Sequence, residues 1–254
     1  MYNRSFIISA FVLLVIAGII IAIVIGIDDD VGDFNIKYIG NAKKYETFIK
    51  QGVNRWSSIG TGGVHVSFKT VASLSGSTVA STLGSTITIS EQKFDTLSSN
   101  LKILTIAHEV GHVLGIGTWA ISDILGQGGQ LYLSNTKYPK TSKAYVDNVR
   151  PTGITLPGAP VESQTSLGSG SYRVHWEDDA TYGMSKDLMV YQIRSSSNVI
   201  SIVDLTYLDE IGRKVDLSQS QSLKSRMYSV IGEYVFKDEV SPYTCGNCEK
   251  CDKD

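Results

Sequence analysis

Two histidines, His108 and His112, enclose a glutamate in the segment HEVGHVLGIGTW (108–119). Four residues of an α-helix advance by about 400°, so a helix here places both imidazoles on one face, about one turn apart. Serine or asparagine at 98–100 can cap the start of this helix, and Gly115 can end it. Apolar residues recur at helical spacing on another side of the same helix: Ile103, Ala107, Val110 and Leu114. The segment therefore predicts a helix with a core on one side and a histidine-lined cleft on the other.

A histidine pair of this spacing around a glutamate is typical of zinc sites. A catalytic zinc ion takes three protein ligands and leaves one position for water, whose pKa falls to about 7. Glu109 adjoins the first histidine and is placed to act as general base toward that water. The alternative is a core helix, in which two histidines and a glutamate would be buried at high cost without partners. We therefore predict one catalytic Zn²⁺, with His108 and His112 as ligands and Glu109 as catalytic residue.

The third ligand is not apparent from the helix itself. Thr118 occupies the position six residues after His112, where many such enzymes carry another histidine. The chain has four histidines in all, and the remaining two are His65, in an alternating segment, and His175, after a long turn-rich region. A carboxylate also qualifies, and the candidates are Glu162, Glu177 and Asp178. Spacing alone leaves these alternatives open.

Hydrophobic patterns elsewhere predict a mixed α+β domain. The expected elements are an amphipathic helix over 42–60, alternating strands over 62–74 and 84–90, and a further helix over 199–212. From Gly115 to about Arg173 the chain is rich in turn residues, which predicts an irregular insertion with at most a short helix near Ala144. Some order is also expected over 226–236.

The N-terminus predicts a membrane anchor, because residues 5–27 form a run of 23 residues without a charge. At about 1.5 Å per residue, a helix of this length spans a hydrocarbon core of about 30 Å. A cleaved signal peptide is the alternative, but its apolar region is usually about 7–15 residues long and ends in small residues. Arg4 precedes the run and Asp28–Asp30 follow it, so the positive-inside rule places the tail 1–4 in the cytoplasm. We therefore expect a single-pass signal-anchor at 5–27, a linker at 28–40 that passes into a strand, and an extracytoplasmic domain.

The charge balance and the positions of the cysteines indicate which partners and which disulfides to expect. The chain has 23 basic and 25 acidic residues without a Lys/Arg cluster, which excludes nucleic acid as an expected partner. Its three cysteines, Cys245, Cys248 and Cys251, lie in a polar segment, 237–254, that we interpret as a flexible tail. The body of the chain therefore folds without disulfides. Nothing in the sequence indicates an oligomeric state.

Several segments resemble one family of zinc proteases. PGAPVESQTSLGSGSYRVHWE (157–177) resembles the stretch that carries the third zinc histidine in the leishmanolysin family of metzincin metalloproteases. DLM (187–189) is similar to the Met-turn of that family, and SIVDLTYLDEIG (201–212) to the helix that follows it. HEVGHVLGIGT matches as well, including the absence of a third histidine nearby. The resemblance covers roughly residues 42–216.

This resemblance implies a metzincin fold over 41–236, with a twisted mixed sheet, an active-site helix and a smaller C-terminal part beyond Gly115. It implies His175 as the third zinc ligand, beside His108 and His112, with Met189 beneath the metal. Tyr191 is a secondary candidate for a zinc contact. In that fold an edge strand pairs with extended substrate through its main chain. The expected edge strand comprises Thr86, Ile87, Thr88 and Ile89.

The leading hypothesis is therefore a membrane-anchored zinc endopeptidase that cleaves protein or peptide substrates outside the cytoplasm. One alternative is an inactive binding or structural protein on the same scaffold, but Glu109 and the candidate ligands are all intact. Another is a zinc hydrolase with a carboxylate as third ligand, although Glu162 lies in a Pro/Gly-rich segment rather than a helix. Members of the leishmanolysin family are usually larger than this chain and rich in cysteine, whereas the body of this chain contains no cysteine.

Overall fold

The computed structural model describes residues 28–31, 34–57, 63–164, 172–193 and 198–217 of the 254-residue chain. The predicted anchor at 5–27, the segment 226–236 and the three cysteines lie outside these residues. Within the described ranges, no helix is long and apolar enough to cross a bilayer.

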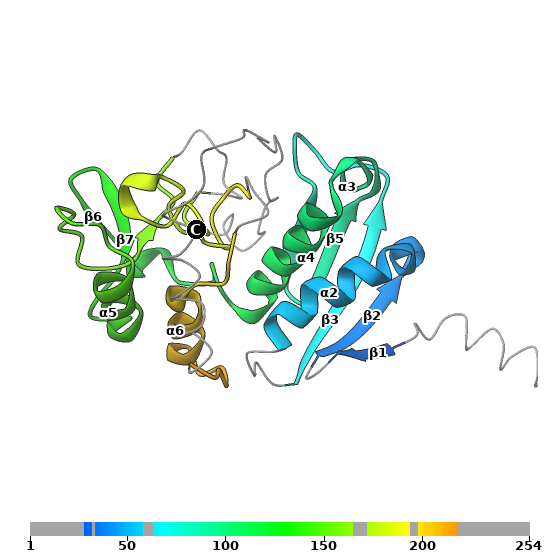
Figure 1. Ribbon diagram of the computed structural model, residues 1–254, viewed down its shortest axis with the longest axis horizontal. Coiled ribbons are helices and arrows are strands. Elements are labelled where there is room, and N and C mark those ends of the chain that lie inside the picture. The colour runs from blue at the N-terminus through cyan, green and yellow to red at the C-terminus, as the bar shows by residue number, and fades with distance from the viewer. Residues whose placement is uncertain (1–27, 32–33, 58–62, 165–171, 194–197, 218–254) are drawn as a thin grey trace, which may run out of the picture.

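The N-terminal half contains a mixed sheet of five strands (Figure 1), and a mixed sheet is what the family resemblance implied. Its strands in spatial order are β1 (Asp28–Val31), β2 (Phe34–Ile39), β3 (Val64–Val71), β5 (Thr86–Ser90) and β4 (Ala80–Leu83). The three inner strands run parallel, whereas β1 and β4 pair antiparallel at the two edges. Residues 28–40, expected to be a linker that passes into a strand, thus contribute two strands to the sheet.

Alternation of side chains gives this sheet one buried face. In β3, Val64, Val66 and Phe68 are buried, whereas His65 and Lys69, on the alternate face, are exposed. This period of two is what a strand with one face against a core requires. The buried face is covered by helices, so the sheet forms a rigid support for them.

Helices α2 (Glu46–Ser57) and α4 (Ser99–Leu114) lie side by side on this face (Figure 1). A 3₁₀ turn (Gly40–Tyr45) precedes α2, and the short α3 (Glu91–Thr96) precedes α4. The two long helices approach closely at Gly52, where a Cβ atom would lie only 2.6 Å from Cγ2 of Ile106. The indole of Trp56 donates a hydrogen bond of 2.6 Å to the carbonyl of Ala107. These contacts fix α4, the helix that carries His108 and His112, against the rest of the half.

The C-terminal half is more regular than the sequence predicted. It contains a small antiparallel sheet of β6 (Ile124–Gln127), β7 (Gln130–Leu133) and β8 (Pro160–Val161). The expected short helix near Ala144 is present as α5 (Pro139–Asn148), and two 3₁₀ turns occupy Ile121–Asp123 and Ala180–Tyr182. Gly128 and Gly129 form the β6–β7 turn with φ angles of 60° and 85°, which only glycine adopts without strain. The glycine pair was therefore a hairpin signal within a region that we expected to be irregular.

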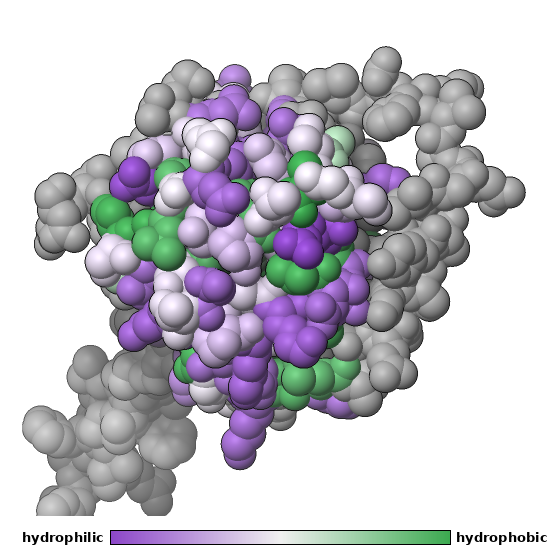
Figure 2. Space-filling view, turned by 90° about the vertical axis from the view of Figure 1, so that its left-hand side faces the viewer, coloured by the Kyte–Doolittle hydropathy of each residue, from purple (hydrophilic) through white to green (hydrophobic). Residues whose placement is uncertain are grey.

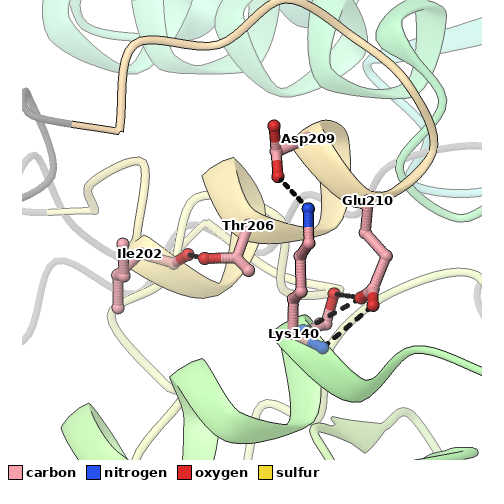
Figure 3. Close-up of polar contacts among 6 residues, drawn as sticks. Lys140, Ile202, Thr206, Asp209 and Glu210 are labelled. Atoms are coloured by element: carbon pink, nitrogen blue, oxygen red, sulfur yellow. Dashed lines mark hydrogen bonds and ion pairs between the residues drawn. The ribbon is translucent and has the colours of Figure 1, made fainter. Parts of the chain in front are cut away.

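Helix α6 (Ile202–Glu210), which the sequence predicted, packs against α5 through polar contacts at the start of α5 (Figure 3). The Glu210 carboxylate accepts hydrogen bonds of 2.9 Å from the main-chain N–H groups of Lys140 and Thr141. Tyr138, the residue before α5, supplies no side-chain cap, so Glu210 satisfies these first-turn donors in its place. Lys140 also pairs with Asp209 at 2.8 Å. These contacts fix α6 relative to α5.

Polar residues predominate on the outer face of the C-terminal half, where apolar residues form only small, separate groups (Figure 2). In the visible described part of this face there is no broad apolar surface of the kind that marks a protein or membrane contact.

Candidate metal centre

Helix α4 presents His108 and His112 as the sequence predicted. It begins after Ser98, whose side chain accepts a hydrogen bond of 3.4 Å from the N–H of Leu101. It ends at Gly115, where φ is 120°. Both histidines are buried, with exposed fractions of 0% and 8%. Both imidazoles are therefore largely shielded from solvent, and of the two only His112 belongs to the lining of a pocket.

His175 joins this pair from the C-terminal half, 63 residues beyond His112. Its carbonyl accepts a hydrogen bond of 2.9 Å from the N–H of Glu162, and the N–H of the next residue, Trp176, donates to the carbonyl of Met189 at 3.1 Å. The Nε2 atom of His108 lies 3.0 Å from that of His112 and 3.2 Å from that of His175, and the third separation is also 3.2 Å. The three side chains form a group able to hold a metal ion.

The other candidate ligands do not reach this group. His65 is exposed on β3, and its Nδ1 lies 3.1 Å from the side-chain oxygen of Asn35. The carboxylates Glu162, Glu177 and Asp178 are buried, but the metal-binding group among the described residues does not include them. Among the alternatives left open by spacing, the geometry selects His175.

Main-chain carbonyls fix which nitrogen of each helix histidine faces the centre. The Nδ1 atom of His108 lies 2.7 Å from the carbonyl oxygen of Leu188, and that of His112 lies 2.9 Å from the carbonyl oxygen of Ile116. Because a carbonyl only accepts, each Nδ1 carries the proton, and in the neutral ring each Nε2 carries a lone pair. Burial lowers the pKa of His112 to about 4. Burial, with the neighbouring histidines, lowers the pKa of His108 well below its usual range.

A metal ion fits this donor set. Two neutral imidazoles direct lone pairs at one point, about 3 Å apart, which is unfavourable unless a cation lies between them. Tetrahedral coordination at metal–nitrogen distances of about 2.0–2.1 Å places nitrogen ligands roughly 3.3 Å from one another. The observed separations of 3.0–3.2 Å are close to this value.

Glu109, on helix α4, directs its side chain toward strand β4 of the sheet. Its carboxylate is fully buried, and its Oε2 accepts a hydrogen bond of 2.6 Å from the hydroxyl of Thr82 on β4. Sequence reasoning missed Thr82, because the contact joins residues 27 apart in two different elements. No local pattern signals such a pairing.

Met189 lies in a tight turn against α4. Its N–H donates to the carboxylate of Asp187 at 2.7 Å, which closes the turn. A Cβ atom at Gly111 would lie 2.3 Å from the Met189 sulfur, so the methionine packs on the helix directly beside His112. Tyr191 is farther out, with its ring centroid 6.4 Å from that of His175.

A pair of buried carboxyl groups supports both the His175 segment and the turn at Met189. Asp204 accepts a hydrogen bond of 2.7 Å from the indole of Trp176, the residue after His175. The carboxyl group of Asp187 is close enough to interact with that of Asp204, and a proton shared by the two groups would remove the repulsion between them. Burial raises the pKa of Asp204 to about 6. Burial and the charge of Asp204 raise the pKa of Asp187 well above its usual range. The sequence did not predict this pair.

The expectation for the edge strand is wrong. Thr86, Ile87, Thr88 and Ile89 belong to β5, which is hydrogen-bonded to β3 on one side and to β4 on the other. Its main chain is therefore occupied by the sheet, and the edge next to α4 is β4. Alternation predicted that β5 is a strand, but alternation does not show which strand lies at an edge.

The free side of β4 follows from its pairing with β5. The N–H of Ser90 donates to the carbonyl of Val79 at 2.8 Å, which makes these two residues a hydrogen-bonded pair. Such pairs alternate along an antiparallel ladder. The main-chain groups of Ala80 and Thr82, opposite Ile89 and Ile87, therefore point away from β5. No other strand among the described residues pairs with that side of β4.

A pocket of about 680 Å³ adjoins the centre. Thr82 and His112 belong to its lining, which also includes Leu83 from the end of β4, Ile211 and Arg213. His112, one member of the candidate metal-binding group, thus borders a space that another molecule can enter.

No known protein-family model, curated protein or solved structure matches this chain. The chemistry of the three histidines and of Glu109 therefore carries the assignment of function.

Proposed function

We propose that the chain is a zinc endopeptidase of the metzincin type, similar to the leishmanolysin family, anchored in a membrane by residues 5–27. The observation that carries this proposal is the convergence of three imidazole Nε2 atoms within 3.0–3.2 Å. Two of these imidazoles, those of His108 and His112, lie on the helix that also bears Glu109. The mixed sheet with its antiparallel edge strand, and the methionine turn packed on α4, support the same assignment.

Zinc is the metal that suits this site best. Among the described residues the group consists of three histidines without a fourth protein ligand. Three imidazoles are the donor set of catalytic zinc, which keeps one position open. When bound, zinc supplies the Lewis acid that activates a water molecule and polarises the scissile carbonyl. The carbonyls of Leu188 and Ile116 hold two of the imidazoles in the tautomer that offers Nε2 to the metal.

Glu109 transfers the proton during hydrolysis. Its carboxylate accepts the proton of the attacking water and delivers it to the amine nitrogen as the C–N bond breaks. The Thr82 hydroxyl, 2.6 Å from Oε2, holds the carboxylate in place during both transfers. Glu109 is therefore the catalytic residue of the chain, and Thr82 is a positioning residue.

Strand β4 supplies a binding surface for an extended peptide. The main-chain groups of Ala80 and Thr82 point to its free side, where a peptide can add as a further strand. Antiparallel addition is the more stable arrangement. In this orientation, peptide residues beside Leu83 are N-terminal to those beside Ala80. Thr82 then connects the peptide-binding strand directly to the general base.

Zinc content and proteolysis of the full-length chain, purified from membranes in detergent, test the proposal. We expect one zinc ion per chain and cleavage of an unfolded protein such as casein by the wild type. Glu109→Gln should retain zinc and lose activity by about 10²-fold or more, because the proton acceptor is removed. His175→Ala should lose both zinc and activity.

His65→Ala is the matched control, because it removes an exposed histidine that lies outside the metal-binding group. It should retain zinc and activity. Undiminished zinc in His175→Ala would rule out this ligand set. Full zinc without cleavage by the wild type would instead favour a metal-containing binding protein.

A further inference from the structure

The pocket beside the metal centre has apolar walls that are exposed in the free chain. Leu83 and Ile211 both line it and are 50% and 38% exposed, among the most exposed large apolar side chains of the described residues. Thr82 and His112 connect the same pocket to the catalytic group. A peptide that lies on β4 therefore places one of its side chains against these walls.

One cation, Arg213, is fixed in the lining of this pocket. Gly212, with φ of 88°, ends α6, and the N–H of Arg213 then donates to the carbonyl of Leu208 at 2.9 Å. The side-chain Nε donates to the carbonyl of Leu114 at 2.9 Å. Leu114 is the last residue of α4, and helix ends offer such carbonyls without a partner in their own helix. Both the main chain and the guanidinium of Arg213 are thus held in position.

The charge of Arg213 has no counterpart in the pocket. None of the lining residues is an aspartate or glutamate, and within the described ranges Arg213 makes no ion pair. Its contact with Leu114 uses only Nε–H, whereas a guanidinium carries five N–H donors. The Nη donors are therefore available to a ligand. A carboxylate matches them best, because it can accept two parallel hydrogen bonds from one guanidinium.

We propose that Arg213 selects peptides with an acidic side chain on the N-terminal side of the scissile bond. The side follows from the antiparallel orientation on β4, since the pocket is lined by Leu83 and Gly84 at the C-terminal end of that strand. A basic side chain at the same position is repelled, and a neutral one leaves the guanidinium without a counter-charge. This inference rests on the proposed endopeptidase function and defines its substrate class.

The test uses sets of matched peptides. Within a set the peptides differ at one position only, which holds Glu, Gln or Lys, and there is one set for each of the three positions before the cleaved bond. For the full-length wild type, kcat/KM should be at least about tenfold higher with Glu than with Gln at one of these positions, as for a charge-assisted hydrogen bond. Arg213→Gln should reduce this Glu/Gln ratio to about one, and Arg213→Glu should favour Lys. Lys214→Gln, which neutralises the adjacent exposed cation outside the pocket lining, should keep the wild-type ratio.

A wild-type ratio near one at all three positions would overturn the inference, and this measurement requires no variant to fold. The inference would also be overturned if Arg213→Gln kept the wild-type Glu/Gln ratio of kcat/KM while its zinc content and thermal stability were normal. Peptide binding to the zinc-loaded Glu109→Gln protein separates this inference from the proposed function. If the wild type cleaves nothing but Glu peptides still bind tighter in an Arg213-dependent manner, the pocket assignment holds and the protease assignment fails.

Discussion

The contact between Thr82 and Glu109 is the residue-scale feature most open to test. Thr82→Val keeps the shape of the side chain but removes the hydroxyl that donates to the carboxylate at 2.6 Å. We expect kcat/KM to fall by about tenfold. We also expect the acid limb of the pH–rate profile to move to higher pH, because a hydrogen bond to a carboxylate favours its charged form.

The matched control is Thr82→Ser, which keeps the hydroxyl and loses only a methyl group, and should retain the wild-type limb. A residue that only fills space would give the opposite order, with Val tolerated and Ser impaired. An acid limb that stays in place in Thr82→Val would exclude the positioning role.

At the scale of elements, the Asp187–Asp204 pair links the His175 segment, the methionine turn and α6. Both groups have raised pKa values in the folded chain, that of Asp204 to about 6. A carboxyl group whose pKa is higher in the folded chain than in the unfolded chain stabilises the fold fully at pH values below its unfolded pKa of about 3.9. This stabilisation is lost as the pH rises toward the pKa of the group in the folded chain. The contribution of the pair to the stability of the fold is therefore smaller at pH 7 than at pH 4.

Asp187→Asn tests this effect, because its amide is an uncharged substitute for a protonated carboxyl and can donate a hydrogen bond to Asp204. The free energy of unfolding of this variant, relative to wild type, should rise between about pH 4 and pH 6, by up to about 1.4 kcal/mol per pH unit for one proton. Urea unfolding followed by tryptophan fluorescence measures it. Asp147→Asn, at an exposed site paired with Lys143, should keep the wild-type slope. A difference between Asp187→Asn and wild type that does not change with pH would contradict a shared proton.

Elements with a strong local period were predicted from the sequence, whereas elements defined by their neighbours were not. Helix α4 has apolar spacing, a serine cap and a terminal glycine, so both its limits and its histidine face were predicted correctly. Strand β4 has only the four residues ASTL, and its position at the edge depends on pairing with β5. The same holds for Thr82, Asp204 and Arg213, whose partners are 27, 28 and 99 residues away in the chain. No local sequence pattern carries such information.

At the scale of the whole molecule, the candidate metal centre takes its ligands from both halves of the chain. His108 and His112 belong to helix α4 of the N-terminal half. His175 belongs to the C-terminal half, where the next residue, Trp176, forms β-bridges with Val161 of β8 and with Val190 beside Met189. A metal ion that binds only the folded chain stabilises it by mass action, by about 2.7 kcal/mol at a free concentration 100 times Kd. Chelation of zinc should therefore lower the urea midpoint of wild type by a corresponding amount.

The same measurement on two histidine variants identifies the origin of this stabilisation. In His175→Ala the midpoint should be nearly the same with zinc and with chelator, because the ligand from the C-terminal half is missing. In His65→Ala it should respond as wild type does, since that exposed histidine is not part of the metal-binding group. If wild type were equally stable with zinc and with chelator, the three converging Nε2 atoms would not form a zinc site in the folded chain. If His175→Ala kept the full response, the stabilising metal would bind elsewhere, and His175 would not link the two halves.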